Sequence, residues 1–117
     1  MKSILLEKSL QLSVQIMNWS SSLNFGDSLF IKNQIQRSCT SIGAHVREAN
    51  SSKSSKDFIN KLKTAFQELE ETEYWIRIIS ETLNQQPTKN IIDLSIECRK
   101  LLCSSIATAS RNQKSKA

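Results

Sequence analysis

The chain has 117 residues with a hydrophobic fraction of 38%, which is enough for one domain whose core needs neither disulfides nor a metal. Two glycines and one proline are very few, and because sheet-rich folds need many turns, this scarcity favours long helices. The net charge of +5 makes an acidic partner such as nucleic acid a candidate ligand, although solubility alone is a sufficient reason for such a charge.

The cysteines and the N-terminus indicate the compartment. Cys39, Cys98 and Cys103 are odd in number, and no two of them have the C-x-x-C spacing of a zinc or redox site. We expect three free, buried thiols, as in a reducing cytosol. The first apolar run ends at Glu7 and Lys8, which is unlike a signal peptide, and no apolar stretch reaches the roughly 20 residues that span a bilayer. We therefore expect a cytoplasmic protein without a membrane anchor.

The first two predicted helices cover about residues 3–19 and 27–50. The main core stripe expected on the first helix is Leu6, Leu10, Val14 and Met17, with Leu5, Leu12 and Trp19 on an adjoining stripe. Asp27 is a suitable N-cap for the second helix. The core stripe expected there is Ile31, Ile35, Ser38, Ile42, His45 and Ala49, and neighbouring small residues would permit close approach by another helix.

The third predicted helix, about 54–84, has the clearest pattern. Ser54 is the expected N-cap, with Asp57 three residues on. The apolar seam then alternates spacings of four and three through Phe58, Leu62, Ala65, Leu69, Thr72, Ile76, Ile79 and Leu83. Glu73 and Arg77 have a favourable i,i+4 spacing on this helix.

The fourth predicted helix covers about 90–110, after Pro87 has ended the third. Thr88 or Asn90 can cap it. Its expected core stripe is Ile91, Leu94, Cys98, Leu101 and Ser105, with Leu102, Ile106 and Ala109 beside it. We expect the basic tail, 111–117, to be frayed.

These elements predict a single all-α domain over residues 1–117, an antiparallel up-down-up-down four-helix bundle, because short connections place successive helices antiparallel. The structural alternative is a three-helix bundle with a swapped fourth helix.

No pattern of residues indicates catalysis, so we expect no enzyme, no catalytic residue, no cofactor and no metal. A di-iron bundle needs Glu-x-x-His pairs, and the only histidine, His45, has Ile42 three residues before it. His45 precedes Glu48 by three residues, and a hydrogen-bonded core histidine is the favoured interpretation over a general base. Glu70 and Glu73 are expected to pair with a basic residue of another helix, such as Arg37 or Arg47.

Charge is distributed unevenly along the chain. Residues 85–117 carry six basic and two acidic side chains, whereas residues 54–84 carry four basic and six acidic ones. The basic C-terminal segment could contact phosphates, although no base-reading or base-stacking motif accompanies it. The candidate nucleic-acid-binding residues are Lys89, Arg99, Lys100, Arg111, Lys114 and Lys116.

A longer motif runs along the second helix. Residues 34–48 read Q-I-Q-R-S-C-T-S-I-G-A-H-V-R-E, and residues 71–75 read E-T-E-Y-W. Together they resemble the Q-x-x-R-x-x-x-S-I-x-x-N-I-x-E and E-T-E-Y-W motifs of a bacterial four-helix-bundle family, the ribosomal RNA intervening-sequence proteins. His45 stands where that family usually has Asn, and Ala49 where it usually has Gly.

The resemblance implies a four-helix bundle, commonly assembled as a ring-like pentamer. The family name comes from the location of the genes within ribosomal RNA intervening sequences and is not evidence of ribosome binding. A similar bundle, the accessory variability determinant of diversity-generating retroelements, is a basic pentamer that binds nucleic acid and a reverse transcriptase.

Two functional hypotheses follow from the charge and the resemblance. The first is a non-enzymatic homo-oligomer that binds RNA, DNA or a nucleoprotein partner through basic surface. The second is a structural or protein-interaction module with no nucleic-acid role.

Overall fold

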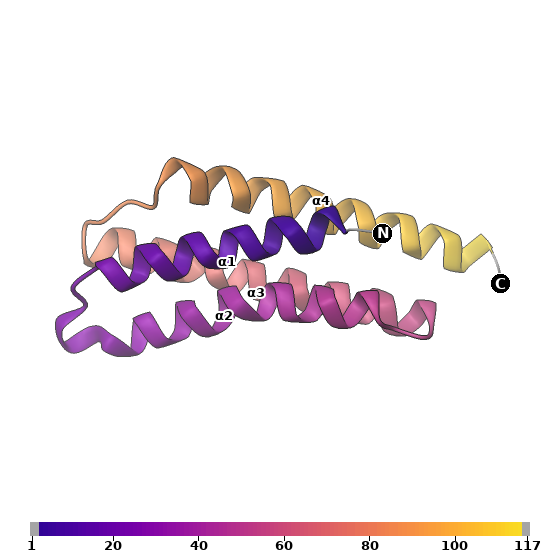
Figure 1. Ribbon diagram of the computed structural model, residues 1–117, viewed down its shortest axis with the longest axis horizontal. Coiled ribbons are helices and arrows are strands. Elements are labelled where there is room, and N and C mark those ends of the chain that lie inside the picture. Colours follow the sequence, from indigo (N-terminus) through magenta and orange to yellow (C-terminus); the bar gives the residue numbers. More distant parts are fainter. Residues whose placement is uncertain (1–2, 116–117) are drawn as a thin grey trace.

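The computed structural model describes residues 3–115, which form four long helices. These are α1 (Ile4–Ser22), α2 (Leu29–Asn50), α3 (Ser55–Thr82) and α4 (Lys89–Ser115), with a short 3₁₀ helix, η1 (Gly26–Ser28), before α2. The molecule is an elongated bundle of 53 × 23 × 22 Å (Figure 1). The predicted all-α, antiparallel four-helix bundle is confirmed.

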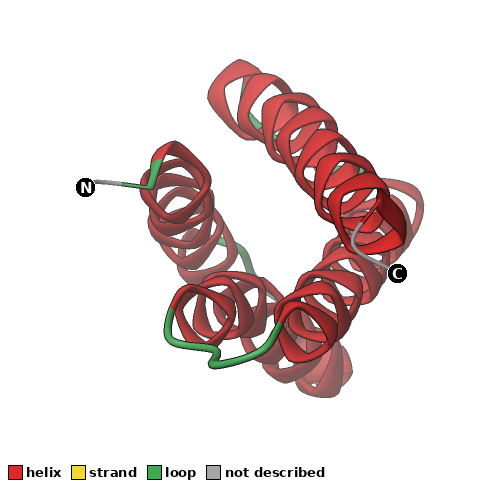
Figure 2. Cartoon of the chain, turned by 90° about the vertical axis from the view of Figure 1, so that its right-hand side faces the viewer, coloured by secondary structure: helices red, strands yellow, loops and turns green. Residues whose placement is uncertain are grey.

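Each helix packs against two others, so that α1, α2, α3 and α4 follow one another around the core (Figure 2). α1 packs against α2 and α4, and α3 packs against α2 and α4, while within residues 3–115 the backbones of the diagonal pairs do not approach closely. Because α4 packs against helices of its own chain, the alternative with a swapped fourth helix is wrong.

The helix starts follow the predicted caps in two of three cases. The Ser54 hydroxyl accepts a hydrogen bond from the backbone N–H of Asp57 at 3.1 Å, and the Thr88 hydroxyl accepts one from Ile91 at 3.2 Å. The predicted cap at Asp27 is wrong. Asp27 lies inside η1, which begins at the left-handed Gly26 (φ 53°), and α2 begins two residues after Asp27.

Two helix ends extend further than the sequence predicted. α1 continues to Ser22. The Ser20 and Ser22 hydroxyls donate hydrogen bonds to the carbonyls of Ile16 and Trp19, both at 2.7 Å, and because these bonds lie within the helix, the serines do not end it. α4 continues to Ser115, so the described part of the basic tail is helical and not frayed.

The predicted seam of α3 forms the centre of the core. Leu62, Ala65, Leu69, Thr72 and Ile79 are almost fully buried, and the other three predicted seam residues are half-buried. On α2 the predicted stripe is buried except at His45, which is half-buried. On α4 Ile91 and Cys98 are buried as predicted, but Leu102 takes the core position expected for Leu101.

The predicted core stripe of α1 is wrong at Leu10 and Val14, whereas Leu6 and Met17 are partly buried against the core and the adjoining stripe of Leu5, Leu12 and Trp19 is buried as predicted. Leu10 and Val14 point to solvent, with exposed fractions of 55% and 47%. The buried face of α1 instead combines apolar residues with three serines: Leu5, Ser9, Leu12, Ser13, Ile16, Trp19 and Ser20.

Close packing against α2 explains this choice of face. The Ser13 hydroxyl lies 2.7 Å from the carbonyl oxygen of Cys39 on α2, and a Cβ atom placed on Gly43 would lie 3.3 Å from the Ser9 hydroxyl oxygen. Small side chains on both helices let the backbones approach, and Leu10 and Val14 are left exposed beside this buried face. A pattern that counts only apolar residues cannot detect a serine-lined core face.

The cysteines are only partly as predicted. Cys39 and Cys98 are buried, and burial raises their thiol pKa to about 12 and about 11 respectively. Cys103 is exposed, because its position on α4 lies on the solvent side of the buried Cys98 and Leu102 face.

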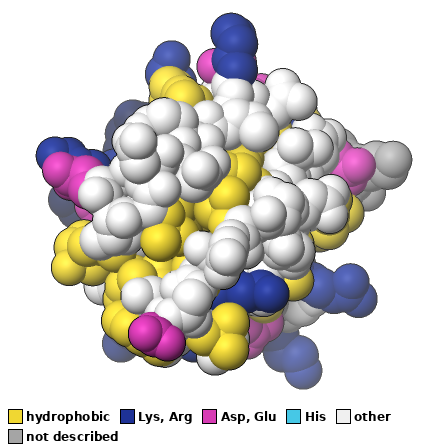
Figure 3. All heavy atoms as spheres, turned by 90° about the vertical axis from the view of Figure 1, so that its left-hand side faces the viewer, with side chains coloured by type: hydrophobic (Ala, Val, Ile, Leu, Met, Phe, Trp, Pro, Cys, Tyr) yellow, Lys and Arg dark blue, Asp and Glu magenta, His cyan; other side chains and the backbone are white. Residues whose placement is uncertain are grey.

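Apolar side chains also reach the surface at the end of the bundle that carries η1 and the α3–α4 connection (Figure 3). Leu29 and Phe30, in the first turn of α2, are exposed. Within residues 3–115, none of the helices combines the length and the apolar character that crossing a membrane requires.

Candidate functional site

The residues of the longer sequence motif meet on the α2–α3 face. The Arg37 guanidinium of α2 binds two carboxylates of α3, Glu68 (Nη1 to Oε2, 3.0 Å) and Glu71. The hydrogen bonds that Arg37 donates to Glu68 and, with a smaller effect, to Glu71 raise the pKa of Arg37 above its usual value. Partial burial raises the pKa of Glu71, but the hydrogen bonds from Arg37 and Trp75 outweigh that effect and bring the pKa below its usual value.

Trp75 completes this cluster, since its indole Nε1 donates to a Glu71 carboxylate oxygen at 3.1 Å. The exposed Tyr74 ring lies edge-on to Trp75, with ring centroids 5.3 Å apart. The E-T-E-Y-W stretch therefore holds α3 against α2 through one carboxylate, which binds an arginine on one side and an indole on the other.

The single histidine belongs to a second polar contact on the same face. His45 Nδ1 lies 3.2 Å from Glu48 Oε1, and Glu48 Oε2 lies 3.3 Å from Lys61 Nζ of α3. His45 Nδ1 nevertheless makes no hydrogen bond within the described residues, so the predicted hydrogen-bonded histidine is wrong, and the contact with Glu48 is one of proximity only. No cluster of three or more His, Cys, Asp or Glu side chains that could hold a metal ion occurs in the described part of the chain.

The acidic residues of α3 pair differently from the prediction. Glu73 binds Arg99 of α4 and accepts a 2.7 Å hydrogen bond from the Ser95 hydroxyl, whereas Arg37 pairs with Glu68 and Glu71. Glu73 therefore pairs with a basic residue of another helix as predicted, but that residue is Arg99, and the named candidates Arg37 and Arg47 are wrong.

Two further details of these pairs follow from helix geometry. Glu73 faces α4, and the Arg99 guanidinium carbon also lies 5.0 Å from the centroid of the Phe66 ring. Arg77 pairs with Glu81 at 2.6 Å and not with Glu73, because Glu73 already binds Arg99.

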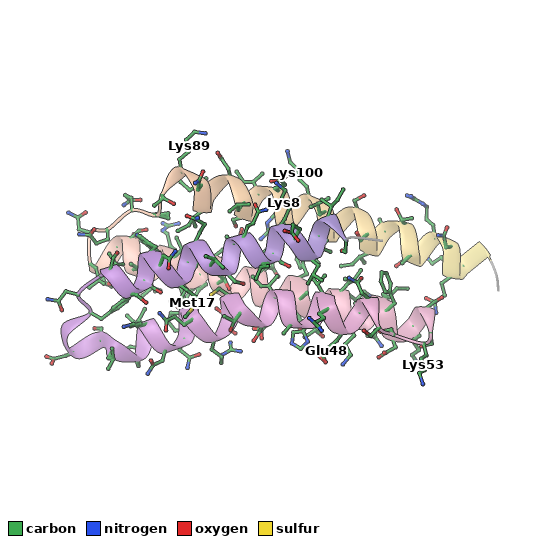
Figure 4. The ribbon with its side chains drawn as sticks, in the orientation of Figure 1. Lys8, Met17, Glu48, Lys53, Lys89 and Lys100 are labelled. Atoms are coloured by element: carbon green, nitrogen blue, oxygen red, sulfur yellow. The ribbon has the colours of Figure 1, made fainter. Side chains whose placement is uncertain are left out.

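The predicted nucleic-acid-binding residues fall into two groups. Lys89 is 2.8 Å from Asp93, which raises the pKa of Lys89, and Arg99 is held by Glu73. Lys100, Arg111 and Lys114 are exposed on α4 and have no ion-pair partner among the described side chains. Figure 4 shows Lys89 and Lys100 pointing away from the bundle. Lys116 lies outside the described residues.

The structure adds two basic residues that the sequence analysis did not include. Lys53 and Lys56 flank the start of α3, and the α2–α3 connection lies at the same end of the bundle as the last turns of α4 (Figures 1 and 4). Both are exposed and without an ion-pair partner among the described side chains. We call Lys53, Lys56, Arg111 and Lys114 the basic end.

A groove of about 370 Å³ separates the two segments of the basic end. It is lined by Ser52, Lys53, Ser54, Ser55, Phe58, Ala109 and Asn112. The S-S-K-S-S-K run of residues 51–56 is the sequence signal that could have identified this loop, but its proximity to α4 is a tertiary property.

Comparisons with known proteins agree with the fold. The model of a family described as 23S rRNA-intervening sequence protein matches residues 1–104. A crystal structure from Bacteroides thetaiotaomicron, of a protein with unknown function from the S23 ribosomal protein family, is similar with a TM-score of 0.76 and 38% identity. The similarity covers 88% of this chain and 98% of that one. A comparison with curated proteins found no match.

Proposed function

Since this chain belongs to the 23S rRNA-intervening sequence protein family, and its motif residues are engaged in helix packing, we propose that it is a non-enzymatic, homo-oligomeric protein that binds nucleic acid, or a nucleoprotein partner, through basic surface. The family resemblance suggests a pentamer. The contact with phosphates is assigned to the basic end.

The single observation that carries this proposal is the unequal pairing of charges. The acidic side chains of α3 at Glu68, Glu71 and Glu73 are neutralised by arginines of α2 and α4. The four cations of the basic end have no such partner among the described side chains, although Asp57 lies in the same first turn of α3 as Lys56. Unpaired, exposed cations favour a polyanion because each phosphate contact releases a counterion.

The chemistry of the basic end favours backbone contacts over base readout. Lysine and arginine alternate there with serine hydroxyls, which also donate to phosphate oxygens. The exposed aromatic residues Phe30 and Tyr74 lie on α2 and α3, and neither lines the groove at the basic end. We therefore expect binding with little sequence preference and a strong dependence on salt.

The test is an electrophoretic shift assay with structured RNA and with duplex DNA at 50 and 200 mM salt. We expect the double variant Lys53→Glu, Lys114→Glu to weaken binding at least tenfold and to reduce the slope of log K against log salt by about 2, the number of phosphate contacts removed. The matched control Lys63→Glu, Arg77→Glu makes the same change in net charge on the flank of α3. Equal losses in both variants, or no binding at low salt, would overturn the proposal.

The second candidate is a structural or protein-interaction module without a nucleic-acid role. The exposed Leu10 and Val14 of α1 favour it, because adjacent exposed aliphatic side chains on one helix face mark interaction surfaces. Nuclease-treated protein that remains oligomeric by light scattering, and that shifts neither RNA nor DNA, would support this candidate over the first.

A further inference from the structure

Two aliphatic surfaces of the bundle lie open to solvent. The first, the α1 crest, consists of Leu6, Leu10, Val14 and Met17, of which Leu10 and Val14 are the most exposed. The second, the α3–α4 groove, has a volume of about 210 Å³ and includes the side chains of Ile76, Pro87, Ile92 and Ile96. Ile92 and Ile96 are 47% and 48% exposed.

The two surfaces flank α4 and share no residue, since Leu10 and Val14 border a hollow between α1 and α4, whereas the groove lies between α3 and α4. The α1 crest is on a helix that packs against α2 and α4, whereas the α3–α4 groove is bordered by α3, the helix diagonal to α1. One copy can therefore present its crest to one neighbour while its groove receives the crest of another. Such a contact between unlike surfaces is heterologous and builds rings or open chains.

We propose that the α1 crest of one copy docks into the α3–α4 groove of a second copy, with α1 antiparallel to the neighbour's α4. This inference rests on the proposed assembly into a homo-oligomer and specifies the surfaces that form it. A ridge of aliphatic side chains on one helix fits between two helices in the manner of ordinary helix packing.

The spacing of residues on the two helices supports the antiparallel register. On α1 the exposed positions Leu10 and Val14 are four residues apart, and on α4 Ile96 and Ile92 are also four apart. With Leu10 opposite Ile96, Val14 lies opposite Ile92. Both pairs then join aliphatic side chains that are half exposed in the single chain.

Charge complementarity identifies the occupant as a second copy of this chain. In the same register Leu6 lies opposite Lys100, and Glu7, the next residue of α1, is offset from Lys100 by one residue, about 1.5 Å along the helix axis. The Glu7 and Lys100 side chains are exposed and have no ion-pair partner among the described side chains. The contact thus matches an unpaired carboxylate to an unpaired ammonium group at the edge of an apolar strip, which is the arrangement that sets register between helices.

The contact leaves the basic end uncovered. It occupies α1 up to Met17 and α4 between Ile92 and Lys100, whereas Arg111 and Lys114 lie three or more helical turns further along α4. Assembly and nucleic-acid binding can therefore be tested separately.

The first experiment measures the oligomeric state by sedimentation velocity over a range of concentrations. We expect Leu10→Glu to raise the dissociation constant of the assembly at least tenfold. The control, Phe30→Glu, places the same charge at an exposed apolar side chain outside both surfaces, and should leave the assembly unchanged. Circular dichroism verifies that both variants are folded.

The second experiment tests the register by charge reversal. Glu7→Lys and Lys100→Glu should each weaken the assembly, and the double variant should restore it. A wild-type protein that is monomeric at all concentrations overturns the homo-oligomer and this contact together, but not nucleic-acid binding. An oligomer that Leu10→Glu leaves intact overturns this contact alone, and a double variant that fails to restore assembly overturns the register.

Discussion

The hydroxyl oxygens of Ser38 on α2 and Thr72 on α3 lie 2.9 Å apart and share a hydrogen bond in the interior of the bundle. Both side chains are almost fully buried, and the Thr72 hydroxyl also lies 2.8 Å from the carbonyl oxygen of Glu68. A hydroxyl pair that occurs within an apolar seam is satisfied in only one alignment of the two helices, so it favours one register of α2 against α3.

Removing either hydroxyl of this pair alone should lower the free energy of unfolding by more than half of the loss that removing both causes. We expect Ser38→Ala to lower the free energy of unfolding by about 1 kcal/mol, since a buried hydrogen bond is lost. The double variant Ser38→Ala, Thr72→Val should lose less than the sum of the two single losses, by about 0.5 kcal/mol or more. Urea denaturation of the wild type, of Ser38→Ala, of Thr72→Val and of the double variant measures these losses. Strictly additive losses would show that the two hydroxyls are not coupled.

The Arg37–Glu71 contact should make stability depend on acid pH. Because the folded state lowers the pKa of Glu71, its contribution is complete above the pKa of the carboxyl in the unfolded chain and is lost as pH falls through the lower folded value. We expect the loss below about pH 4, the ordinary range of a glutamate carboxyl.

The matching variant for this pH effect is Arg37→Met, which removes the cation and keeps a long side chain. It should flatten the decline in melting temperature between neutral pH and pH 3, by an amount equivalent to less than about 1 kcal/mol because the pair is partly exposed. A variant with an unchanged pH profile would contradict the assignment to Glu71.

Arg99 joins α4 to α3 through both charge and packing. Arg99→Ala should destabilise the protein by about 1 kcal/mol, because Glu73 loses its cation and Phe66 loses the guanidinium that covers its ring. Arg99→Lys should recover only part of this, since an ammonium group does not stack on a ring as a guanidinium does. The control is Lys100→Ala, at the exposed neighbouring position. Measured at a low protein concentration, where the proposed contact between copies does not form, it should change the melting temperature little.

The three thiols should differ in reactivity. At pH 8 the native protein should expose one thiol per chain to an aromatic disulfide reagent, at Cys103, whereas burial and a raised pKa protect Cys39 and Cys98. Unfolding in guanidinium chloride should make all three reactive. A Cys103→Ser variant that still reacts rapidly in the native state would show that one of the buried thiols is accessible.

Much of the fold could be predicted from periodicity, because most of the helices bury one face whose residues recur at spacings of three and four. The seam from Phe58 to Leu83 places apolar side chains at spacings of three and four, and α3 has this one stripe facing the bundle. The candidate cations of α4 were also visible in the sequence. What the sequence did not reveal is which of them are already engaged, as Arg99 is with Glu73, since that depends on the facing helix.

The amino-acid sequence by itself therefore determined the number of helices, their order, most of the buried faces and the family. The tertiary structure decided which side of α1 is buried, because a serine-lined face approaches Gly43 of α2 more closely than an aliphatic one can. It also decided that Lys53 and Lys56 lie at the same end of the bundle as the last turns of α4. Local spacing encodes the face of one helix, whereas the pairing of distant faces depends on shape and charge across the bundle.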